Sequence, residues 1–184
     1  MLIMGIDPGI NGGLFLVEDG SYKDMSVMPV TQENVGFAKV QGRLKRDKEG
    51  NKVTKYRTEV DAKAVAKLLS AWSPNRIFME KVHAFPGQGV TSMFSFGRSF
   101  GVLCGAIAWL DCELVLVEPK AWQTVILGGN DKEEDTKELS ARAAMSIWPT
   151  VSFLKSPRSR KAHDGLCDAA CMAAYGMRCG KIDG

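Results

Sequence analysis

The sequence predicts a single α/β domain in which helices cover both faces of a mixed sheet. The chain has 184 residues, of which 45% are hydrophobic, and this is enough to bury one core without disulfides. The first apolar segments are short and separated by turn residues, as in an antiparallel meander. Later segments alternate between strand-like and helical periodicity, which favours strands connected through helices.

The N-terminal part of the chain predicts three strands. Residues 2–7 form an apolar run that ends in an acid, and turn-forming residues from Pro8 to Gly13 separate it from a second strand at residues 14–18. A third strand covers residues 22–28. Because the connections are short, we expect these strands to be neighbours in one sheet.

Two strongly basic segments interrupt this pattern. Residues 43–57 carry seven cations against two acids, with Glu49, Gly50 and Asn51 at a turn near the centre. We expect a protruding hairpin or mobile loop here, inserted at about residues 36–58 of one domain that spans residues 1–184. Residues 155–161 carry four cations and no acid. Each segment alone can be a solvated loop. Whether it binds a partner depends on the residues that lie beside it.

The rest of the chain alternates helices and strands. Its periodicity predicts, in order, a helix at residues 60–71, a strand at 76–82, a helix at 91–110, a strand at 114–117, a short helix from Pro119, and helices at 136–148 and 162–177. Ser73, Pro74 and Asn75 stop the first helix, and Pro119 occupies a favoured first-turn position. This order places helices on both faces of the sheet.

Composition narrows the classes of function. The longest apolar stretch, residues 100–110, contains two glycines and is shorter than the roughly 20 residues that cross a bilayer. The N-terminus lacks a basic export signal, so we expect a cytoplasmic protein with no membrane partner. Five cysteines, without a Cys-x-x-Cys pair, predict reduced core thiols. Cys167 and Cys171 lie four residues apart on a predicted helix, where packing is favoured over shared binding of an ion.

Four acids occupy positions where an unpaired carboxylate would be costly. Asp7 ends an apolar strand, and Glu80 repeats this pattern. Asp164 and Asp168 lie four residues apart, on one face of the last predicted helix. Because like charges repel strongly at low dielectric, a convergent cluster needs a divalent cation, and oxygen ligands favour Mg²⁺ or Mn²⁺. Taken singly, Asp164 or Asp168 would be interpreted as a cap or a surface residue.

Several motifs occur in a specific order. They are Met4-Gly5-Ile6-Asp7-Pro8-Gly9, Phe78-Met79-Glu80-Lys81-Val82, Phe96-Gly97-Arg98-Ser99-Phe100-Gly101, Glu118-Pro119-Lys120-Ala121-Trp122 and His163-Asp164-Gly165-Leu166-Cys167-Asp168-Ala169-Ala170. Over nearly the whole chain, they resemble the phage-type branch of the RuvC-like Holliday junction resolvases in the ribonuclease H-like superfamily. The resemblance implies a ribonuclease H-like fold with a five-stranded mixed sheet and helices on both faces.

The resemblance also implies a set of catalytic metal ligands. Asp7, Glu80 and Asp168 match the carboxylates that bind metal in the family. Many relatives place a fourth acid or a histidine at the position of Gly165, whereas the phage-type branch is similar to this chain in having His-Asp-Gly. Asp164 is therefore assigned as the fourth ligand. The implied cofactors are two Mg²⁺ (or Mn²⁺) ions per active site, roughly 4 Å apart.

Four further residues receive roles through the resemblance. His163 either supports the ligands from beside them or only starts the last helix. Lys137 resembles the family's basic residue near the scissile phosphate, with an ordinary surface lysine as the alternative. Where the family places an aromatic wedge this chain has His83, and Phe85 two residues later can either stack on a base or pack.

The implied function is a metal-dependent, structure-selective endodeoxyribonuclease. It would resolve four-way (Holliday) junctions by paired symmetric nicks that leave 5′-phosphate and 3′-hydroxyl ends. The two-fold symmetry of such a junction implies a homodimer, with residues 91–110 as the candidate interface and a core helix as the alternative. Sequence-independent contacts to DNA phosphates would come from Arg43, Lys45, Arg46, Lys48, Lys52, Lys55, Arg57, Lys155, Arg158, Arg160 and Lys161. The expected setting is a bacterial cell, with a phage as a further possible source.

Other functions stay open at this point. A nuclease of the same fold could act on flaps, forks, three-way branches or RNA–DNA hybrids. An actin-like ATPase or a sugar kinase shares the first motif, but that architecture needs a second such subdomain and roughly twice this length, so no nucleotide cofactor is expected. A non-catalytic DNA-binding protein is disfavoured because the acids are intact at every motif.

Overall fold

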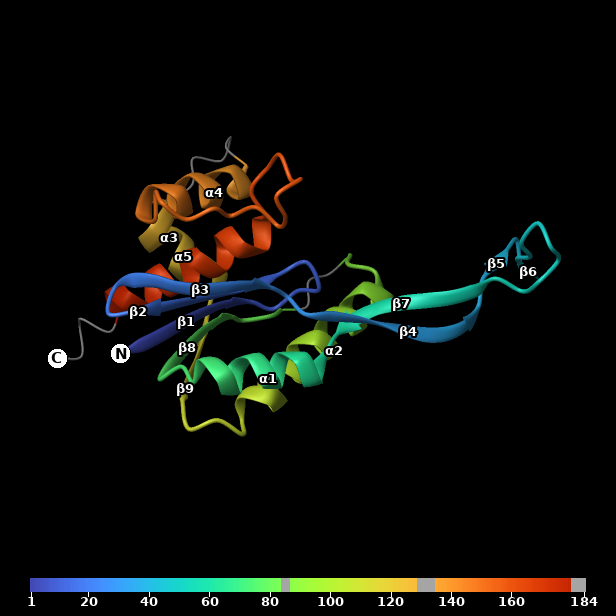
Figure 1. Cartoon of the computed structure of the whole chain (residues 1–184), viewed down its shortest axis with the longest axis horizontal. Coiled ribbons are helices and arrows are strands. Elements are labelled where there is room, and N and C mark those ends of the chain that lie inside the picture. Colours follow the sequence, from blue (N-terminus) through green and yellow to red (C-terminus); the bar gives the residue numbers. More distant parts are fainter. Residues whose placement is uncertain (84–86, 129–134, 180–184) are drawn as a thin grey trace.

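The five-stranded mixed sheet predicted from the sequence is confirmed in a computed structural model, which describes residues 1–83, 87–128 and 135–179 (Figure 1). The strands are β1 Leu2–Asp7, β2 Gly13–Glu18, β3 Ser21–Val27, β8 Arg76–Glu80 and β9 Glu113–Val117. Their order in the sheet is β3-β2-β1-β8-β9. β1 pairs antiparallel with β2 and parallel with β8, so the sheet is mixed and β1 is central.

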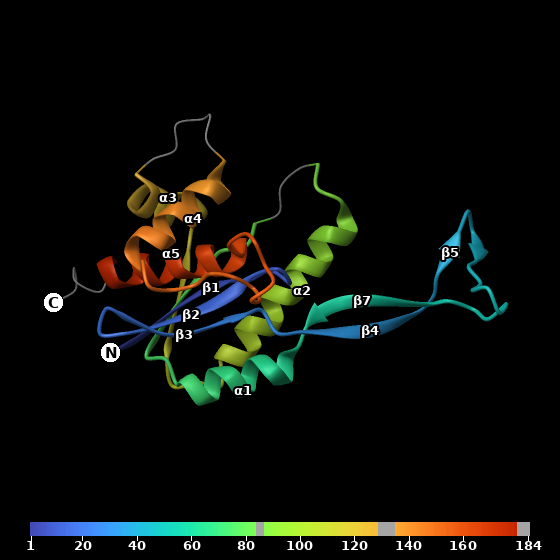
Figure 2. The same cartoon turned by 45° about the horizontal axis from the view of Figure 1, so that its top comes forward.

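In the described part of the chain, five helices cover the two faces of this sheet. They are α1 Ala62–Trp72, α2 Val90–Ile107, α3 Pro119–Leu127, α4 Thr136–Ile147 and α5 Asp164–Cys179. Figures 1 and 2 show α1 and α2 on one side of the sheet and α3, α4 and α5 on the other. Side chains alternate along β1, so Met4 and Ile6 join the core under α1 and α2, whereas Ile3 joins the core under α5.

Helix α5 lies unusually close to the sheet. A Cβ atom added at Gly5 of β1 would lie 1.9 Å from the carbonyl oxygen of Ala169, and one added at Gly165 would lie 2.4 Å from the carbonyl oxygen of Asn11. Only glycine permits backbones to approach so closely. This contact places Asp168, the residue before Ala169, beside the C-terminal end of β1.

A two-stranded ribbon extends away from the body between β3 and α1 (Figures 1 and 2). Its strands are β4 Val30–Phe37 and β7 Thr54–Val60, which pair antiparallel, and a smaller pair, β5 Lys39–Val40 and β6 Arg43–Leu44, lies at its far end. We call β4 and β7 the ribbon, and residues 38–53 its tip. All eight residues of β4 are exposed, so no apolar alternation marked the start of this strand in the sequence.

Two helix boundaries differ from the sequence prediction for a local reason. Asp61 caps α1 by accepting hydrogen bonds from the backbone N–H groups of Lys63 and Ala64, so the helix starts at Ala62 and Val60 belongs to β7. Helix α5 starts at Asp164 rather than at residue 162. Here the carbonyl of His163 accepts the first hydrogen bonds, from the N–H groups of Leu166 and Cys167.

Helix α2 ends at Ile107, three residues before the predicted end, and is longer than the apolar stretch at residues 100–110. By length and composition alone it could cross a membrane, with a mean hydropathy of 1.2 over 18 residues. It is the one helix in the described part of the chain that meets this criterion. One side of α2 is buried through Ser99, Leu103 and Ile107, whereas Val90 and Phe94 on the other side are exposed.

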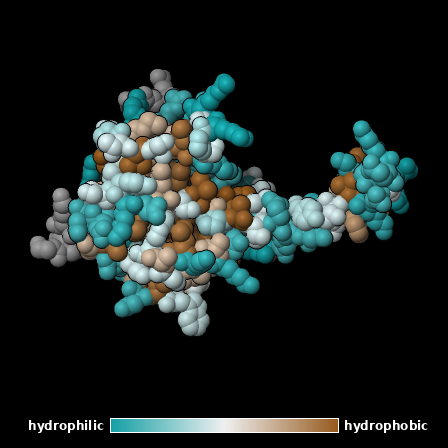
Figure 3. Space-filling model, viewed as in Figure 1, coloured by the Kyte–Doolittle hydropathy of each residue, from teal (hydrophilic) through white to brown (hydrophobic). Residues whose placement is uncertain are grey.

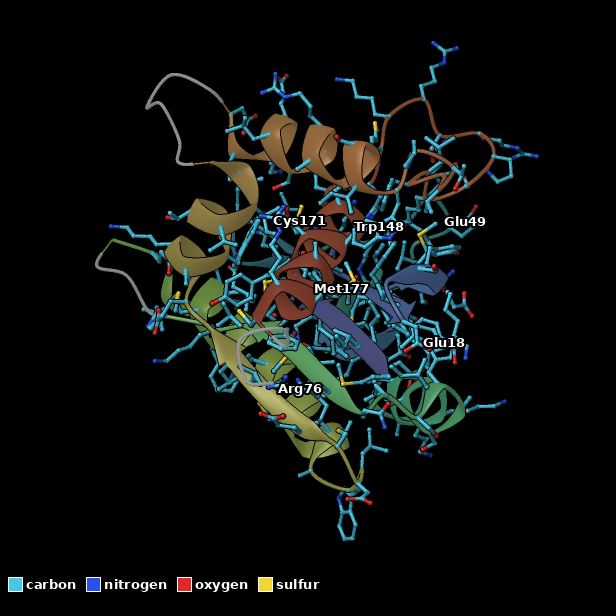
Figure 4. The ribbon with its side chains drawn as sticks, turned by 90° about the vertical axis from the view of Figure 1, so that its left-hand side faces the viewer. Glu18, Glu49, Arg76, Trp148, Cys171 and Met177 are labelled. Carbon is cyan, nitrogen blue, oxygen red and sulfur yellow. The ribbon has the colours of Figure 1, made fainter. Side chains whose placement is uncertain are left out.

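The cysteines are all free, as the sequence predicted. Cys167 and Cys171 are buried on the face of α5 that lies under α4, where Figure 4 shows the position of Cys171. Burial raises the pKa of the Cys167 thiol to about 12, which keeps it protonated. The Sγ of Cys171 donates a 3.6 Å hydrogen bond to the carbonyl oxygen of Ser140.

Candidate active site

Asp7 stands at the C-terminal end of β1, where the chain turns sharply before β2. The turn is closed by a 2.9 Å hydrogen bond from the N–H of Gly12 to the carbonyl of Gly9. Burial raises the pKa of Asp7 to about 7, with further contributions from the charges of Asp168, Glu80 and Asp164. Acids from two other elements, β8 and α5, therefore raise the pKa of the Asp7 carboxyl.

Glu80 ends β8, the parallel neighbour of β1. Its Oε2 accepts a 2.8 Å hydrogen bond from the indole Nε1 of Trp122, which is buried at the start of α3. Burial raises the pKa of Glu80, the indole hydrogen bond lowers it, and the charge of Asp168 raises it again. Trp122 thus holds one carboxylate oxygen of Glu80 in place. Sequence reasoning had quoted Trp122 only as part of a motif.

Asp164 and Asp168 both belong to α5, as the spacing predicted. Burial raises the pKa of Asp168, and so does the charge of Asp164. The hydroxyl of Ser140 and the charge of Lys137 lower this pKa. Asp164 lies at the exposed start of the helix and forms a 2.9 Å ion pair with the Nζ of Lys137 from α4. This ion pair raises the pKa of Lys137, which keeps its ammonium charged beside the acids.

The acids converge from three elements, but they do not form a closed ligand cage. Among the described residues, no group of three or more His, Cys, Asp or Glu side chains is placed to hold a metal ion. The donors are nevertheless all carboxylate oxygens, with one carboxyl desolvated and exposed to the charges of three others. That chemistry fits a hard divalent cation.

The acids open onto a cavity of about 640 Å³. Its walls come from the turn after β1, from β7, from the start of α4 and α5, and from α2. Its lining includes Asp7, Lys137, Asp164, Asp168, Arg57, Thr58, Thr91, Ser92, Ser95, Phe96 and Ser99. Glu80 is not part of this lining. It lies at the end of β8, the strand next to β1, beside the other three acids.

Sequence reasoning missed the hydroxyl wall that α2 contributes. Ser92, Ser95 and Ser99 are spaced three and four residues apart, so they face the cavity together. Hydroxyl groups can donate hydrogen bonds to phosphate oxygens without adding charge. The spacing was visible in the sequence, but α2 was considered there only for its apolar residues.

The two histidines lie outside the cavity lining. His163 accepts a 3.3 Å hydrogen bond at Nδ1 from the N–H of Leu166, so its contacts are those of a residue that starts α5. Burial lowers the pKa of His163, and the charge of Lys155 lowers it further. The Nε2 of His83 lies 2.6 Å from Oε2 of Glu118, and the Oε1 of the same carboxylate accepts a 2.7 Å hydrogen bond from Lys81. Phe85 lies outside the described residues.

The predicted DNA-binding cations occupy three places. Arg43, Lys45, Arg46, Lys48 and Lys52 are exposed in the tip, Lys55 is exposed on β7, and Arg57 is at the base of the ribbon. Lys155, Arg158, Arg160 and Lys161 are exposed in the loop before α5, which an isolated bridge between Leu154 and Ala162 closes. The ribbon base lines the active-site cavity, and the loop leads directly into α5 and its acids.

Comparison with known proteins supports the fold. Neither protein-family models nor curated protein sequences match this chain. Among solved structures, Thermus thermophilus RuvC in complex with a Holliday junction substrate matches with a TM-score of 0.55 at 15% identity, over 98% of this chain and 97% of that one. The chain has the RuvC-like fold. A second Thermus thermophilus RuvC structure matches with a TM-score of 0.54 at 19% identity, over 98% of this chain and 97% of that one.

The RuvC-like fold confirms the ribonuclease H-like architecture that the motifs implied. In this chain it brings the C-terminal ends of β1 and β8 together with the start of α5. These are the three places where the sequence carries its four acids. At identities of 15% and 19%, the likeness concerns the fold, and the chemistry must be argued from this chain's own residues.

Proposed function

We propose that the protein is a metal-dependent endonuclease that cuts branched DNA, with four-way junctions as its main substrate. The observation that carries this proposal is the acid group around Asp7, whose pKa is raised to about 7 by burial and three neighbouring acids. Lys137 offsets part of this repulsion, and near neutral pH a proton on Asp7 or a bound cation relieves the rest. The arrangement is therefore that of a binding site rather than of a structural cluster. The RuvC-like fold places this group beside a cavity lined by cations and hydroxyls.

Asp7, Glu80, Asp168 and Asp164 would hold two Mg²⁺ or Mn²⁺ ions. When bound, these ions lower the pKa of an attacking water and stabilise the leaving 3′ oxygen, which gives 5′-phosphate and 3′-hydroxyl ends. The ammonium of Lys137, held at 2.9 Å from Asp164, would contact the scissile phosphate.

The residues that line the cavity suit a phosphodiester backbone. Ser92 and Ser95 would donate hydrogen bonds to phosphate oxygens on one wall, whereas the hydroxyl of Ser99 donates to the carbonyl of Ser95. Cations of the ribbon and of the loop at residues 155–161 would hold flanking phosphates, in contacts that weaken as salt rises. One relative in fold, Thermus thermophilus RuvC, is described in complex with a Holliday junction substrate, which supports branched DNA as the ligand.

The experiment that tests the function is a cleavage assay on matched substrates. The purified protein is incubated with end-labelled four-way, three-way, flap and linear duplex DNA, with Mg²⁺ or Mn²⁺ and with EDTA as the control. Paired symmetric nicks confined to the four-way species support junction resolution. Equal cutting of all branched species would replace it by a broader debranching nuclease, and no metal-dependent cutting of any species would refute the proposal.

Metal binding should depend on pH in a defined direction. The pKa of Asp7 is raised in the folded state, so the folded protein binds a proton more tightly than the unfolded chain, and its stability falls as pH rises from about 4 to about 7. Mg²⁺ needs the deprotonated carboxylates. We therefore expect Mg²⁺ to raise the melting temperature more at pH 7.5 than at pH 5, as measured by scanning calorimetry. An equal or larger shift at pH 5 would contradict this assignment of the acids.

Trp122→Phe should weaken metal binding, although the phenyl ring still fills most of the space that the indole occupies. The variant loses the 2.8 Å hydrogen bond that orients Glu80. Loss of such a supporting contact typically lowers metal affinity by about 10-fold or more. Calorimetric titration with Mn²⁺ measures this. Trp148→Phe is the matched control, because Trp148 is also buried but packs against Phe15, with ring centroids 4.7 Å apart. Equal affinities in the two variants would contradict the role of Trp122.

A homodimer formed through α2 would present two active sites to a four-way junction. Val90 and Phe94 are 85% and 68% exposed. Gly97, Gly101 and Gly105 continue the same face, and a Cβ added at any of them would meet nothing within 4 Å. An open apolar face lined with glycines suits close approach of a second helix.

Phe94→Glu should therefore dissociate the dimer, because a carboxylate cannot be buried without a partner. Sedimentation velocity measures the mass of the wild-type protein and of the variant. Val125→Glu on α3 is the control, since it adds the same charge at an exposed apolar position away from α2. A monomeric wild-type protein, or a dimer that both variants keep, would rule out this interface.

A further inference from the structure

The ribbon has two chemically different ends. At its base, where β7 lines the active-site cavity, the cations are paired with acids. At its tip, the cations are exposed and have no acid partner. We propose that the ribbon is an anchored arm that binds the phosphate backbone of a duplex arm away from the cut. This inference rests on the proposed function and assigns the partner of a second surface.

Four charged residues from three elements form the base. Arg57 of β7 donates to Glu33 of β4 at 2.9 Å and also contacts Glu59. Arg98 of α2 pairs with Glu33 at 3.2 Å and with Glu59 at 3.3 Å. Two guanidinium groups therefore balance two carboxylates, and the side chain of Glu59 is only 5% exposed. The side chains of Arg57, Glu33 and Arg98 are 38%, 44% and 39% exposed, so Glu59 is the buried member of the network. Ion pairs that join three elements to one buried carboxylate restrict how those elements lie relative to one another.

The network ties the ribbon to the wall of the active site. Thr58, between Arg57 and Glu59, lines the cavity, and its Oγ1 accepts a 2.9 Å hydrogen bond from Gln32 of β4. Arg98 follows Ser95 on α2, and Ser95 lines the same cavity. The direction in which the ribbon leaves the body is therefore set relative to the acids.

The tip is structured and carries unpaired charge. Asp47 accepts hydrogen bonds from the N–H groups of Glu49 and Asn51, and Arg46 donates to the carbonyl of Gly50 at 2.6 Å. Within the described ranges, no acid lies within ion-pair distance of the remaining cations of this region. These cations are Lys39, Arg43, Lys45, Lys48, Lys52 and Lys55. Figure 3 shows the tip as a mostly hydrophilic surface with a small apolar part.

The charge and the shape favour a nucleic-acid backbone over a protein partner. Residues 43–57 carry seven cations and two acids. The exposed apolar side chains of the ribbon and tip are distributed over four strands: Val30, Val35 and Phe37 on β4, Val40 on β5, Leu44 on β6 and Tyr56 on β7. The eight residues of β4 span roughly 23 Å at the usual rise of a strand. This corresponds to about 7 base pairs of duplex, so the tip lies beyond the phosphates that enter the cavity.

The test compares binding to four-way junctions with short and long arms. Arms of about 6 base pairs, closed by hairpin loops, end before the tip, whereas arms of about 20 base pairs pass it. Affinities are measured in EDTA by fluorescence anisotropy, so the assay does not need cleavage. The tip variant combines Arg43→Gln, Lys45→Gln and Lys48→Gln. We expect it to lose about 10-fold in affinity for long arms and less than about twofold for short arms, and to lower the salt slope by about 3 on long arms only.

Two further variants complete the design. A matched charge control combines Lys155→Gln, Arg158→Gln and Arg160→Gln, which should weaken short-arm and long-arm binding equally. Arg98→Gln keeps the tip cations but loosens the base, and it should reduce the preference for long arms. Thermal melting checks that each variant folds.

An equal effect of the tip variant on both arm lengths, or no effect on either, would overturn the inference. If junctions bind with this arm-length dependence but are never cut, the proposed nuclease fails while the ribbon assignment stands. If the wild-type protein binds no junction, both are overturned.

Discussion

Asp7→Asn should lower the rate of DNA cleavage by about 1,000-fold or more, which corresponds to roughly 4 kcal/mol of transition-state stabilisation. The amide has nearly the same shape as the carboxyl but lacks the charge that would hold a divalent cation. Asp7 also has the central place in the group, because the charges of Asp168, Glu80 and Asp164 all act on it. Single-turnover cleavage of a labelled four-way junction measures the loss.

The same variant should keep its affinity for junction DNA and gain stability. Removing one of several mutually repelling acids relieves the folded state, so the apo variant should melt at a higher temperature than the wild type at pH 7.5. Asp111→Asn is the control, since it removes one charge from an exposed loop before β9. Unchanged cleavage by purified Asp7→Asn protein, beside full activity of the control, would defeat the assignment of the active site.

Much of the fold could be predicted because its core elements carry clear periodic patterns. β1 is apolar up to Asp7, and its neighbour β8 is apolar up to Glu80. The ribbon could be predicted only in part. β4 is exposed on every residue, so its sequence of polar side chains does not differ from that of a loop. The pairing of β4 with β7 depends on tertiary contacts such as that between Glu33 and Arg57, which local sequence does not encode.

The candidate site, too, could be predicted from the sequence only in part. The acids stand out in sequence because a charged residue at the end of an apolar strand is unusual, and the topology then brings strand ends together. The supporting contacts do not stand out. Trp122 lies 42 residues from Glu80, and Lys137 lies 27 residues from Asp164, so only the folded chain shows that they meet. Whether the acids bind metal is tested by the titration with Mn²⁺.

The packing of α5 against β1 controls the position of Asp168, and Gly5 is the residue on which this packing depends. A Cβ at Gly5 would lie 1.9 Å from the carbonyl oxygen of Ala169 and 2.4 Å from the backbone nitrogen of Ala173. Both atoms belong to the helix backbone, so no side-chain rotation can relieve the clash. The whole helix must move outward.

Gly5→Ala should therefore destabilise the fold by about 3 kcal/mol, at the upper end of the cost of overpacking a core. The outward shift would also carry Asp168 away from Asp7, so cleavage and Mn²⁺ affinity should fall in the molecules that remain folded. Urea unfolding measures the free energy of unfolding, and calorimetric titration measures the affinity for Mn²⁺. Gly9→Ala is the control, because its Cβ would have ordinary contacts at 3.8 Å and cost little. Equal stability of the two variants would show that α5 can move away from β1 without loss, and that Asp168 is not held in place by this contact.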